Sequence, residues 1–236
     1  MDRHQLWHRS SDVAIIQSDT DDGTASDKRS TARPAMEAVG NFVLVFAFGI
    51  AIATHSWFAP LLIGAPLVAM VSSRNRVPDA YYNPSLTFAM LMRGRIAFRD
   101  TLAFWLIQLG SGLLAAMLVC AMVGPRQLAV TAATVKGSTL VAALALELVF
   151  TSALCFVAVD VSRSNSRTDN GWPIALGVMA SAIAIGAATN DAFYPEISFD
   201  DAVLGILSWP TLWIYLVSQL LSGIAATITF LSLAEQ

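Results

Sequence analysis

The stretches "DAYYNPS" (Asp79–Ser85) and "DAFYPEIS" (Asp191–Ser198) decide the fold, because they are two copies of one short polar motif. Both read Asp-Ala-aromatic-Tyr and then reach a proline. The first copy places Asn83 directly before its proline, whereas the second has lost that asparagine, so Tyr194 precedes Pro195. A repeated motif with one altered copy indicates an internal duplication whose halves have diverged.

The composition around these motifs is that of a membrane protein. The chain has 236 residues, of which 56% are hydrophobic and 13% charged, and its mean hydropathy is +0.61. Soluble domains carry about 25% charged residues. The apolar residues form long blocks, each close to the ~20 residues that a helix needs to cross the hydrocarbon core. The predicted spans are residues 35–55, 58–73, 101–123, 139–160, 172–189 and 211–233.

Two further apolar segments, residues 84–92 and 195–207, are too short to cross a membrane. Each follows one copy of the motif and begins with proline, which is favoured at the first position of a helix. The second segment also carries Glu196, Asp200 and Asp201. We therefore expect two half-helices that enter the membrane from opposite sides.

An internal repeat links these segments. "QLGSGLLAA" and "QLLSGIAAT" begin 111 residues apart, which is also the separation of the two prolines, and two intramembrane glutamates are 110 residues apart. The paired landmarks are Gln108 with Gln219, Pro84 with Pro195, and Glu37 with Glu147. Each copy holds three complete spans, so the second copy enters from the opposite face and the repeats are inverted. The predicted fold is an all-α membrane protein with six transmembrane helices and two opposed re-entrant half-helices.

Charge and polarity divide the chain further. Residues 1–33 are rich in Asp, Ser and Thr and are expected to form a disordered cytoplasmic tail. Residues 34–236 form the membrane domain, with repeat one at 35–123 and repeat two at 139–233. Arginine and lysine concentrate on the side that holds the N-terminus, which predicts that both termini are cytoplasmic. We expect a multi-pass protein of the plasma membrane.

The sequence offers little for catalysis or metal binding. Cys120 and Cys155 each lie alone inside an apolar block, and two of the three histidines fall in the N-terminal tail. No nucleophile–base or metal-ligand spacing is evident, and the net charge of −3 does not indicate nucleic-acid binding. We predict no enzyme activity, no cofactor and no metal.

The half-helices carry the expected chemistry. A helix that begins inside the membrane leaves free N–H groups and the positive end of its dipole there, and lipid cannot satisfy them. Two such ends facing each other suit a path for neutral polar solutes and repel cations. Asn83 is placed to cap its half-helix and to offer amide donors to a solute.

These residues resemble the aquaporin, or major intrinsic protein, family over roughly residues 35–233. The resemblance rests on "EAVGNFVLVF", on "NPSLT" (with Asn83, Pro84 and Ser85) in place of Asn-Pro-Ala, on Gln-x-x-Ser-Gly in spans three and six, and on "WPIALG". It implies a passive pore for water or small neutral solutes, glycerol-like ones included, in a homotetramer with one pore per subunit.

The resemblance also places the selectivity filter and shows where this chain departs from the family. The filter positions fall on Ile63, Ala182 or Ala184, Asp191 and Ile197. The second motif is Tyr194, Pro195 and Glu196, Ile197 stands in place of the family's arginine, and Tyr81 replaces a histidine beside the first motif. Glu37, Glu147, Gln108 and Gln219 are interpreted as supports that hydrogen-bond the motif loops or neighbouring helices.

Other readings remain open at this stage. The altered second motif also fits a non-conducting homologue with a structural or interaction role in the membrane. Asp191, Glu196 and the missing arginine fit a cation- or proton-permeable pore. An ion-coupled transporter built from inverted repeats is a further alternative, although acids at matched repeat positions are more simply read as loop supports.

Overall fold

The computed structural model describes residues 32–51, 53–54, 58–73, 81–124, 138–161, 172–174, 176–180, 195–203 and 209–234. Regular secondary structure within these ranges is helical. The long helices are the N-terminal helix Ala32–Ala51, α4 Phe98–Val123, α6 Ser138–Val161 and α9 Trp209–Ala234, with the shorter α2 at Ala59–Ser73. They match five of the predicted spans closely. The span predicted at 172–189 lies mostly outside the described residues, and those of it that are described are helical.

Three helices among the described residues are long and apolar enough to cross a membrane. They are the N-terminal helix Ala32–Ala51, α4, and residues Tyr215–Leu233 within α9. α6 has 24 residues, and its only acidic residues are Glu147 and Asp160. A helix rises 1.5 Å per residue, so elements of this length cover the hydrocarbon core of a bilayer.

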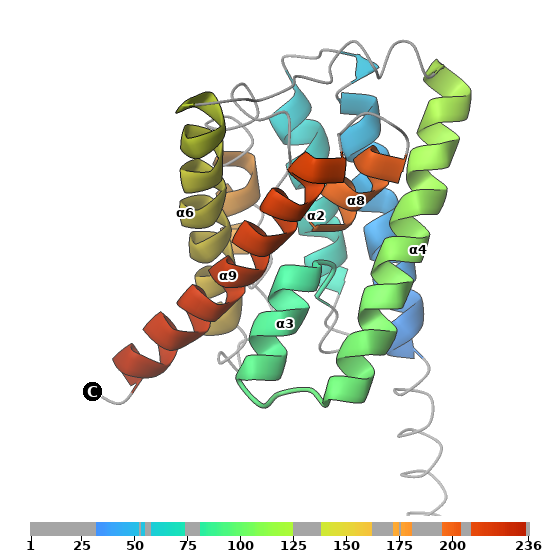
Figure 1. The fold of residues 1–236 in the computed structure, drawn as a ribbon. Helices are drawn as coiled ribbons and strands as arrows, with labels where there is room; N and C mark the ends of the chain where they lie inside the picture. Colours follow the sequence, from blue (N-terminus) through green and yellow to red (C-terminus); the bar gives the residue numbers. More distant parts are fainter. Residues whose placement is uncertain are drawn as a thin grey trace, which may run out of the picture.

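The two short helices begin where the sequence predicts. α3 is Pro84–Met92 and α8 is Pro195–Val203, and each starts at the proline that follows a motif. The prediction continued the second segment to residue 207, and its residues 204–207 lie outside the described ranges. α8 lies above α3 in Figure 1, and the two helices are in contact. The half-helices therefore occupy opposite halves of the molecule.

The end of α3 is fixed by local backbone chemistry. The helix ends at Met92 with Arg93 as its C-cap, and Gly94 follows in the left-handed conformation with φ of 71°. The Gly94 N–H donates to the Leu91 carbonyl and the Arg95 N–H donates to the Met90 carbonyl, both over 2.9 Å. This is the Schellman arrangement, which satisfies the last carbonyls of a helix. The half-helix thus has a defined end as well as a defined start.

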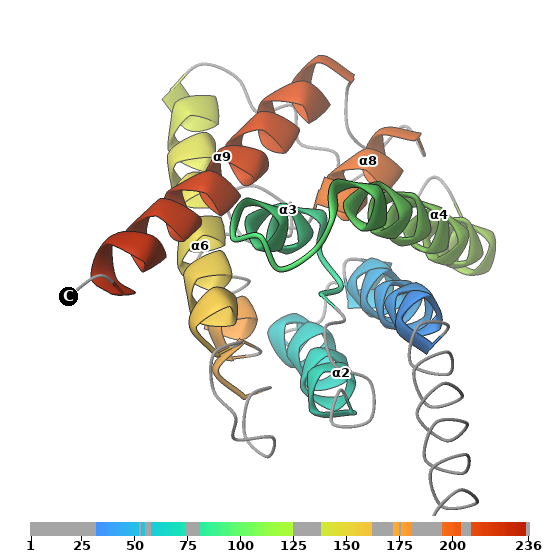
Figure 2. The same ribbon diagram turned by 90° about the horizontal axis from the view of Figure 1, so that it is seen from below.

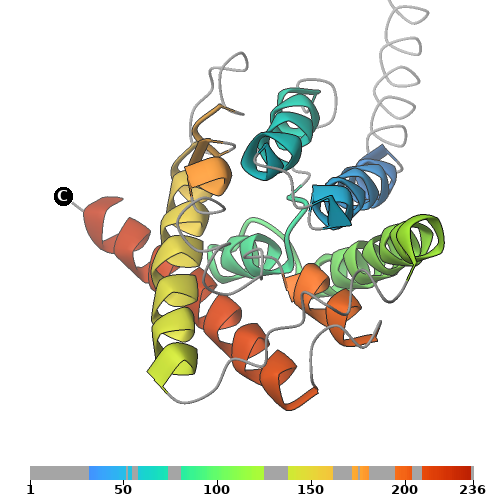
Figure 3. The ribbon, with the colours of Figure 1, turned by 90° about the horizontal axis from the view of Figure 1, so that it is seen from above.

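Packing places α3 at the centre of the molecule. Figure 2 shows α3 enclosed by α2, α4, α6, α9 and the N-terminal helix, and α3 contacts α4, α6, α8 and α9. Figure 3, from the opposite side, shows α8 against α4. Each half-helix therefore packs against a long helix of the other repeat, α3 on α9 and α8 on α4.

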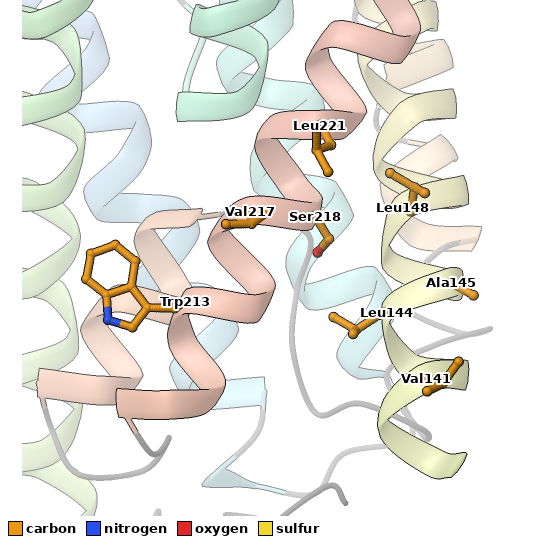
Figure 4. Close-up of a pocket in the computed structure, with 8 residues that line it drawn as sticks. All are labelled: Val141, Leu144, Ala145, Leu148, Trp213, Val217, Ser218 and Leu221. Atoms are coloured by element: carbon orange, nitrogen blue, oxygen red, sulfur yellow. The ribbon is translucent and has the colours of Figure 1, made fainter. Parts of the chain in front are cut away.

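The outside of the helix bundle is apolar. One open groove of about 640 Å³ runs between α6 and α9, as Figure 4 shows. Its lining residues are Val141, Leu144, Ala145, Leu148, Trp213, Val217, Ser218 and Leu221. Among them only Ser218 carries a polar group other than the indole N–H of Trp213, so the groove offers few partners to a polar solute.

Candidate functional site

Asn83 fixes the start of α3. Its backbone is extended, with φ of −158° and ψ of 124°, and its side-chain Oδ1 accepts hydrogen bonds from the N–H groups of Ser85 (2.7 Å) and Leu86 (3.1 Å). Pro84 occupies the first helical position and has no N–H that needs a partner. The asparagine therefore satisfies backbone donors that would otherwise be left unpaired inside the protein.

Glu37 of the N-terminal helix holds the loop before Asn83. Its carboxylate accepts hydrogen bonds from the backbone N–H groups of Tyr81 and Tyr82, the second over 2.9 Å. Tyr82 has φ of 55°, a left-handed conformation that costs a non-glycine residue about 1 to 2 kcal/mol. Hydrogen bonds to a charged acceptor are stronger than neutral ones, so the carboxylate can hold the loop in this conformation.

Gln108 connects this loop to α4 and α3. Its Nε2 donates to Glu37 Oε2 and to Thr87 Oγ1, each over 3.0 Å. The Thr87 hydroxyl in turn donates to the Asn83 carbonyl over 2.9 Å. All four side chains are buried, so a continuous polar network joins the N-terminal helix, α4 and the first turn of α3.

Sequence reasoning did not single out two of the side chains that complete this site. Asn41 Nδ2 donates to the Glu37 carbonyl over 3.1 Å and lies 3.5 Å from Glu37 Oε2. Trp105 Nε1 donates to the Pro84 carbonyl over 3.1 Å. The internal repeat could have pointed to Asn41. Asn41 and Thr151 are polar residues at matched positions 110 residues apart, the same separation as Glu37 and Glu147.

The second repeat contains counterparts of this network. Gln219 Nε2 donates to Ser198 Oγ over 3.4 Å, the counterpart of the bond from Gln108 to Thr87. Thr151 Oγ1 donates to Glu147 Oε2 over 3.5 Å, as Asn41 does to Glu37. These four side chains are fully buried.

Some of the remaining predicted site residues lie outside the residues that the structure describes. Ile63 lies in α2, is 7% exposed and belongs to the main hydrophobic core. Ala182, Ala184, Asp191 and Tyr194 lie outside the described residues. Pro195, Glu196 and Ile197 form the first turn of α8, and only their backbone is described. The structure therefore brings together the predicted residues of the first motif and leaves three of the four filter positions without described side chains.

Two glycines set how closely the half-helices approach the long helices. A Cβ atom added to Gly223 of α9 would lie 2.8 Å from the backbone oxygen of Ser85 in α3. A Cβ added to Gly112 of α4 would lie 2.4 Å from Oδ2 of Asp200 in α8. The Gln-x-x-Ser-Gly repeat thus supplies a glycine at both crossings, where an added Cβ would collide with the α3 backbone at Gly223 and with the Asp200 carboxyl group at Gly112.

The electrostatics of the first motif suit uncharged polar groups. α3 carries no ionisable residue, and its N-terminal end has the partial positive charge of the helix dipole. The negative charge of Glu37 is taken up by the N–H donors around it. Among the described residues no group of three or more His, Cys, Asp or Glu side chains could hold a metal ion.

Comparison with known proteins identifies the family. The sequence model of the major intrinsic protein family matches residues 25–230, and the chain belongs to that family. The probable aquaporin TIP3-2 of Arabidopsis thaliana is 30% identical over 169 residues, which cover 70% of this chain and 62% of that protein. Aquaporin NIP1-4 of Oryza sativa subsp. japonica is 28% identical over 165 residues, 69% of this chain and 59% of that protein.

The extent of these matches differs between relatives. Aquaporin TIP4-1 of Arabidopsis thaliana is 27% identical over 201 residues, which cover 80% of each chain. The matches to TIP3-2 and NIP1-4 span less than two thirds of those proteins. Family membership confirms the predicted fold class, with six membrane-spanning helices and two half-helices, and the chain is an integral multi-pass membrane protein.

Proposed function

We propose that the protein is a passive channel for water and small uncharged solutes. The observation that carries this proposal is the capped start of α3, where Asn83 is held by the network of Glu37, Gln108 and Thr87. Such a network keeps the polar start of a helix in one position inside the membrane. A rigid set of hydrogen-bond donors beside a dipole end favours neutral polar solutes over cations.

The selectivity of this channel differs from that of a pore with an arginine filter. Ile63 and Ile197 supply no hydrogen-bond donors to the filter, and Asp191 and Ala182 complete the proposed constriction. A constriction with two isoleucines strips water less effectively and admits larger or less polar molecules, such as glycerol. This part of the proposal rests on the positions that the family resemblance assigns.

The proposal includes the setting of the channel. We place it in the plasma membrane with both termini cytoplasmic, with a tail followed by a channel domain. The boundary predicted between residues 33 and 34 moves two residues earlier, because Ala32 and Arg33 already belong to the N-terminal helix. The N-terminal helix begins and α9 ends at the same end of the molecule in Figure 1, which supports termini on one side. The family resemblance supports a homotetramer with one pore per subunit.

Stopped-flow light scattering on proteoliposomes tests the channel. Osmotic steps with sucrose, glycerol and urea are applied to vesicles with and without purified protein. Fast shrinkage in sucrose, or re-swelling in glycerol or urea, above the empty-vesicle rate supports a neutral-solute pore and gives its size limit. Rates equal to those of empty vesicles, with protein shown to be folded and inserted, contradict the proposal.

The altered second motif favours one alternative. With Tyr194, Glu196 and Ile197 in the second motif, the chain fits a cation-permeable or a non-conducting homologue as well. Electrical recording on planar bilayers separates these cases. A cation current that is lost in Asp191→Asn supports the cation pore, whereas neither current nor solute flux supports a structural role.

A further inference from the structure

Asp200 is a buried acid that the pore proposal does not use. It lies on α8, is 1% exposed, and neither carboxyl oxygen has a hydrogen-bond partner in the described part of the chain. Its Oδ2 faces Gly112 of α4, where an added Cβ would lie 2.4 Å away. The carboxyl group therefore sits inside the contact between α8 and α4, which Figure 3 shows from above.

The repeat shows that the fold does not need an acid at this place. The residue 111 positions earlier is Ala89 of α3, which is fully buried. Ala89 faces α9 at Gly223, just as Asp200 faces α4 at Gly112, and its backbone N lies 3.7 Å from a Cβ added to that glycine. An alanine meets the steric requirement of this crossing, so the carboxyl group of Asp200 is an additional chemical feature.

Within the described ranges, no positive charge compensates Asp200. Among the helices that contact α8, α3 carries no ionisable residue, and the one titratable side chain of α9 is the buried Tyr215, whose phenol never carries a positive charge. Val45 of the N-terminal helix lies beside the same glycine. The other elements near Asp200 carry six charged residues. They are Arg33 and Glu37 on the N-terminal helix, Arg99 and Asp100 on α4, and Glu196 and Asp201 on α8 itself.

The two cations among these residues are placed elsewhere. Arg33 lies over the Phe104 ring, 5.6 Å from its centroid, and Arg99 is exposed in the first turn of α4. Arg99 precedes Gly112 by about 20 Å along the helix. An ionised carboxylate buried without a partner is strongly unfavourable, and a neutral carboxylic acid avoids most of that desolvation cost.

We propose that Asp200 is a proton-binding site, and that its neutral form docks α8 against α4 at Gly112. When the proton leaves, the charged carboxylate is unstable in this contact, and α8 moves so that water can reach it. Because α8 carries the second motif, the proton at Asp200 would then set the position of that motif. The inference concerns protonation and docking, and it stands whether or not the pore conducts.

Infrared spectroscopy of the purified full-length protein in liposomes tests the proton site directly. A protonated carboxyl group has a carbonyl stretching band that a carboxylate lacks. We expect the parent protein at neutral pH to show a band that is missing in Asp200→Asn and retained in Asp100→Asn, which alters an exposed acid. Identical spectra of the parent and Asp200→Asn, with both proteins folded, overturn the proposal.

The pH dependence of thermal unfolding gives a second, independent readout. An exposed aspartate in the unfolded chain titrates near pH ~4, so a native state that keeps the proton loses stability as pH rises above that value. The melting temperature of the parent should therefore fall more between mildly acidic and mildly alkaline pH than that of Asp200→Asn. Asp200→Ala, which copies Ala89, should show the same reduced dependence. Equal pH dependence in all three proteins contradicts the proposal.

Discussion

Glu37 and Gln108, 71 residues apart in the chain, are joined by a 3.0 Å hydrogen bond between Nε2 and Oε2. The bond connects the N-terminal helix to α4, and the same carboxylate also holds the loop that leads into α3. One buried side chain thus fixes three elements around the first motif.

Replacing Glu37 by Gln should destabilise the protein by about 2 kcal/mol or more, because an amide NH₂ then faces N–H donors in place of an acceptor oxygen. The measurement is the melting temperature in detergent, together with water flux in liposomes. Asp100→Asn, which removes an exposed charge, is the matched control and should leave both unchanged. A parent-like melting temperature for Glu37→Gln would mean that the loop does not depend on this carboxylate.

Two substitutions of Asn83 separate its role as a helix cap from a role in contacting solutes. Asn83→Ala removes the acceptor for Ser85 and Leu86 and should cost about 1 kcal/mol of stability and reduce flux. Asn83→Asp keeps the capping oxygen, because aspartate caps helices as well as asparagine does. Stopped-flow rates and melting temperatures of both variants are compared. Retained stability with lost flux in Asn83→Asp assigns the amide a role in the pore, whereas parent-like flux refutes that role.

The crossing of α9 and α3 should tolerate no side chain at Gly223. Gly223→Ala places a Cβ 2.8 Å from a backbone oxygen that cannot move alone, and overpacking of this kind costs about 1 to 3 kcal/mol. Gly110→Ala on α4 is the control, since an added Cβ there meets nothing within 4 Å. Thermal unfolding should separate the two variants, and equal melting temperatures would show that α3 can shift at no cost.

A bulky residue at Ile63 tests the proposed constriction. Ile63→Trp should reduce the flux of every permeant solute, because Ile63 is buried on the inner side of α2. Leu62→Trp, at a neighbouring position that is 40% exposed, should leave flux unchanged. The readout is the rate of osmotic shrinkage and re-swelling at matched protein density. Unchanged flux in Ile63→Trp places the constriction elsewhere.

Arg93 holds the far end of α3. Its Nη1 donates to the Val159 carbonyl of α6 over 3.1 Å, and its guanidinium lies 4.5 Å from the centroid of the Phe230 ring in α9. Arg93→Met should lower stability by about 1 to 3 kcal/mol, since it removes a charged hydrogen bond and a cation–π contact. Arg95→Met changes an exposed neighbour and serves as the control. Similar melting temperatures for both would exclude a structural role for Arg93.

The fold was largely readable from the sequence because membrane spans and helix-initiating prolines are local signals. Long apolar blocks gave the spans, and Pro84 and Pro195 gave the starts of α3 and α8. The starts of the N-terminal helix and of α4 were each predicted three residues later than they lie in the structure. Helix ends depend on caps and on the first and last turns, which hydropathy does not report.

The site was readable only where the repeat marked it. The matched positions of Glu37 with Glu147 and Gln108 with Gln219 singled out the buried supports before their partners were known. Trp105 has no matching residue in the second repeat that would have singled it out. Its hydrogen bond to the Pro84 carbonyl depends on how α4 packs against α3, which the sequence does not report. The left-handed backbone conformation of Tyr82 could not be predicted either, because tyrosine has no local preference for a positive φ.

The packing of α3 on α9 has a consequence for how the protein is made. Thr227 Oγ1 donates to the Ala89 carbonyl across 138 residues of sequence, so α9 leaves the ribosome long after α3 does. α3 therefore waits for its main partner while the intervening helices are made. Those helices can enter the bilayer one by one, but the first half-helix reaches its final position only after α9 has been synthesised.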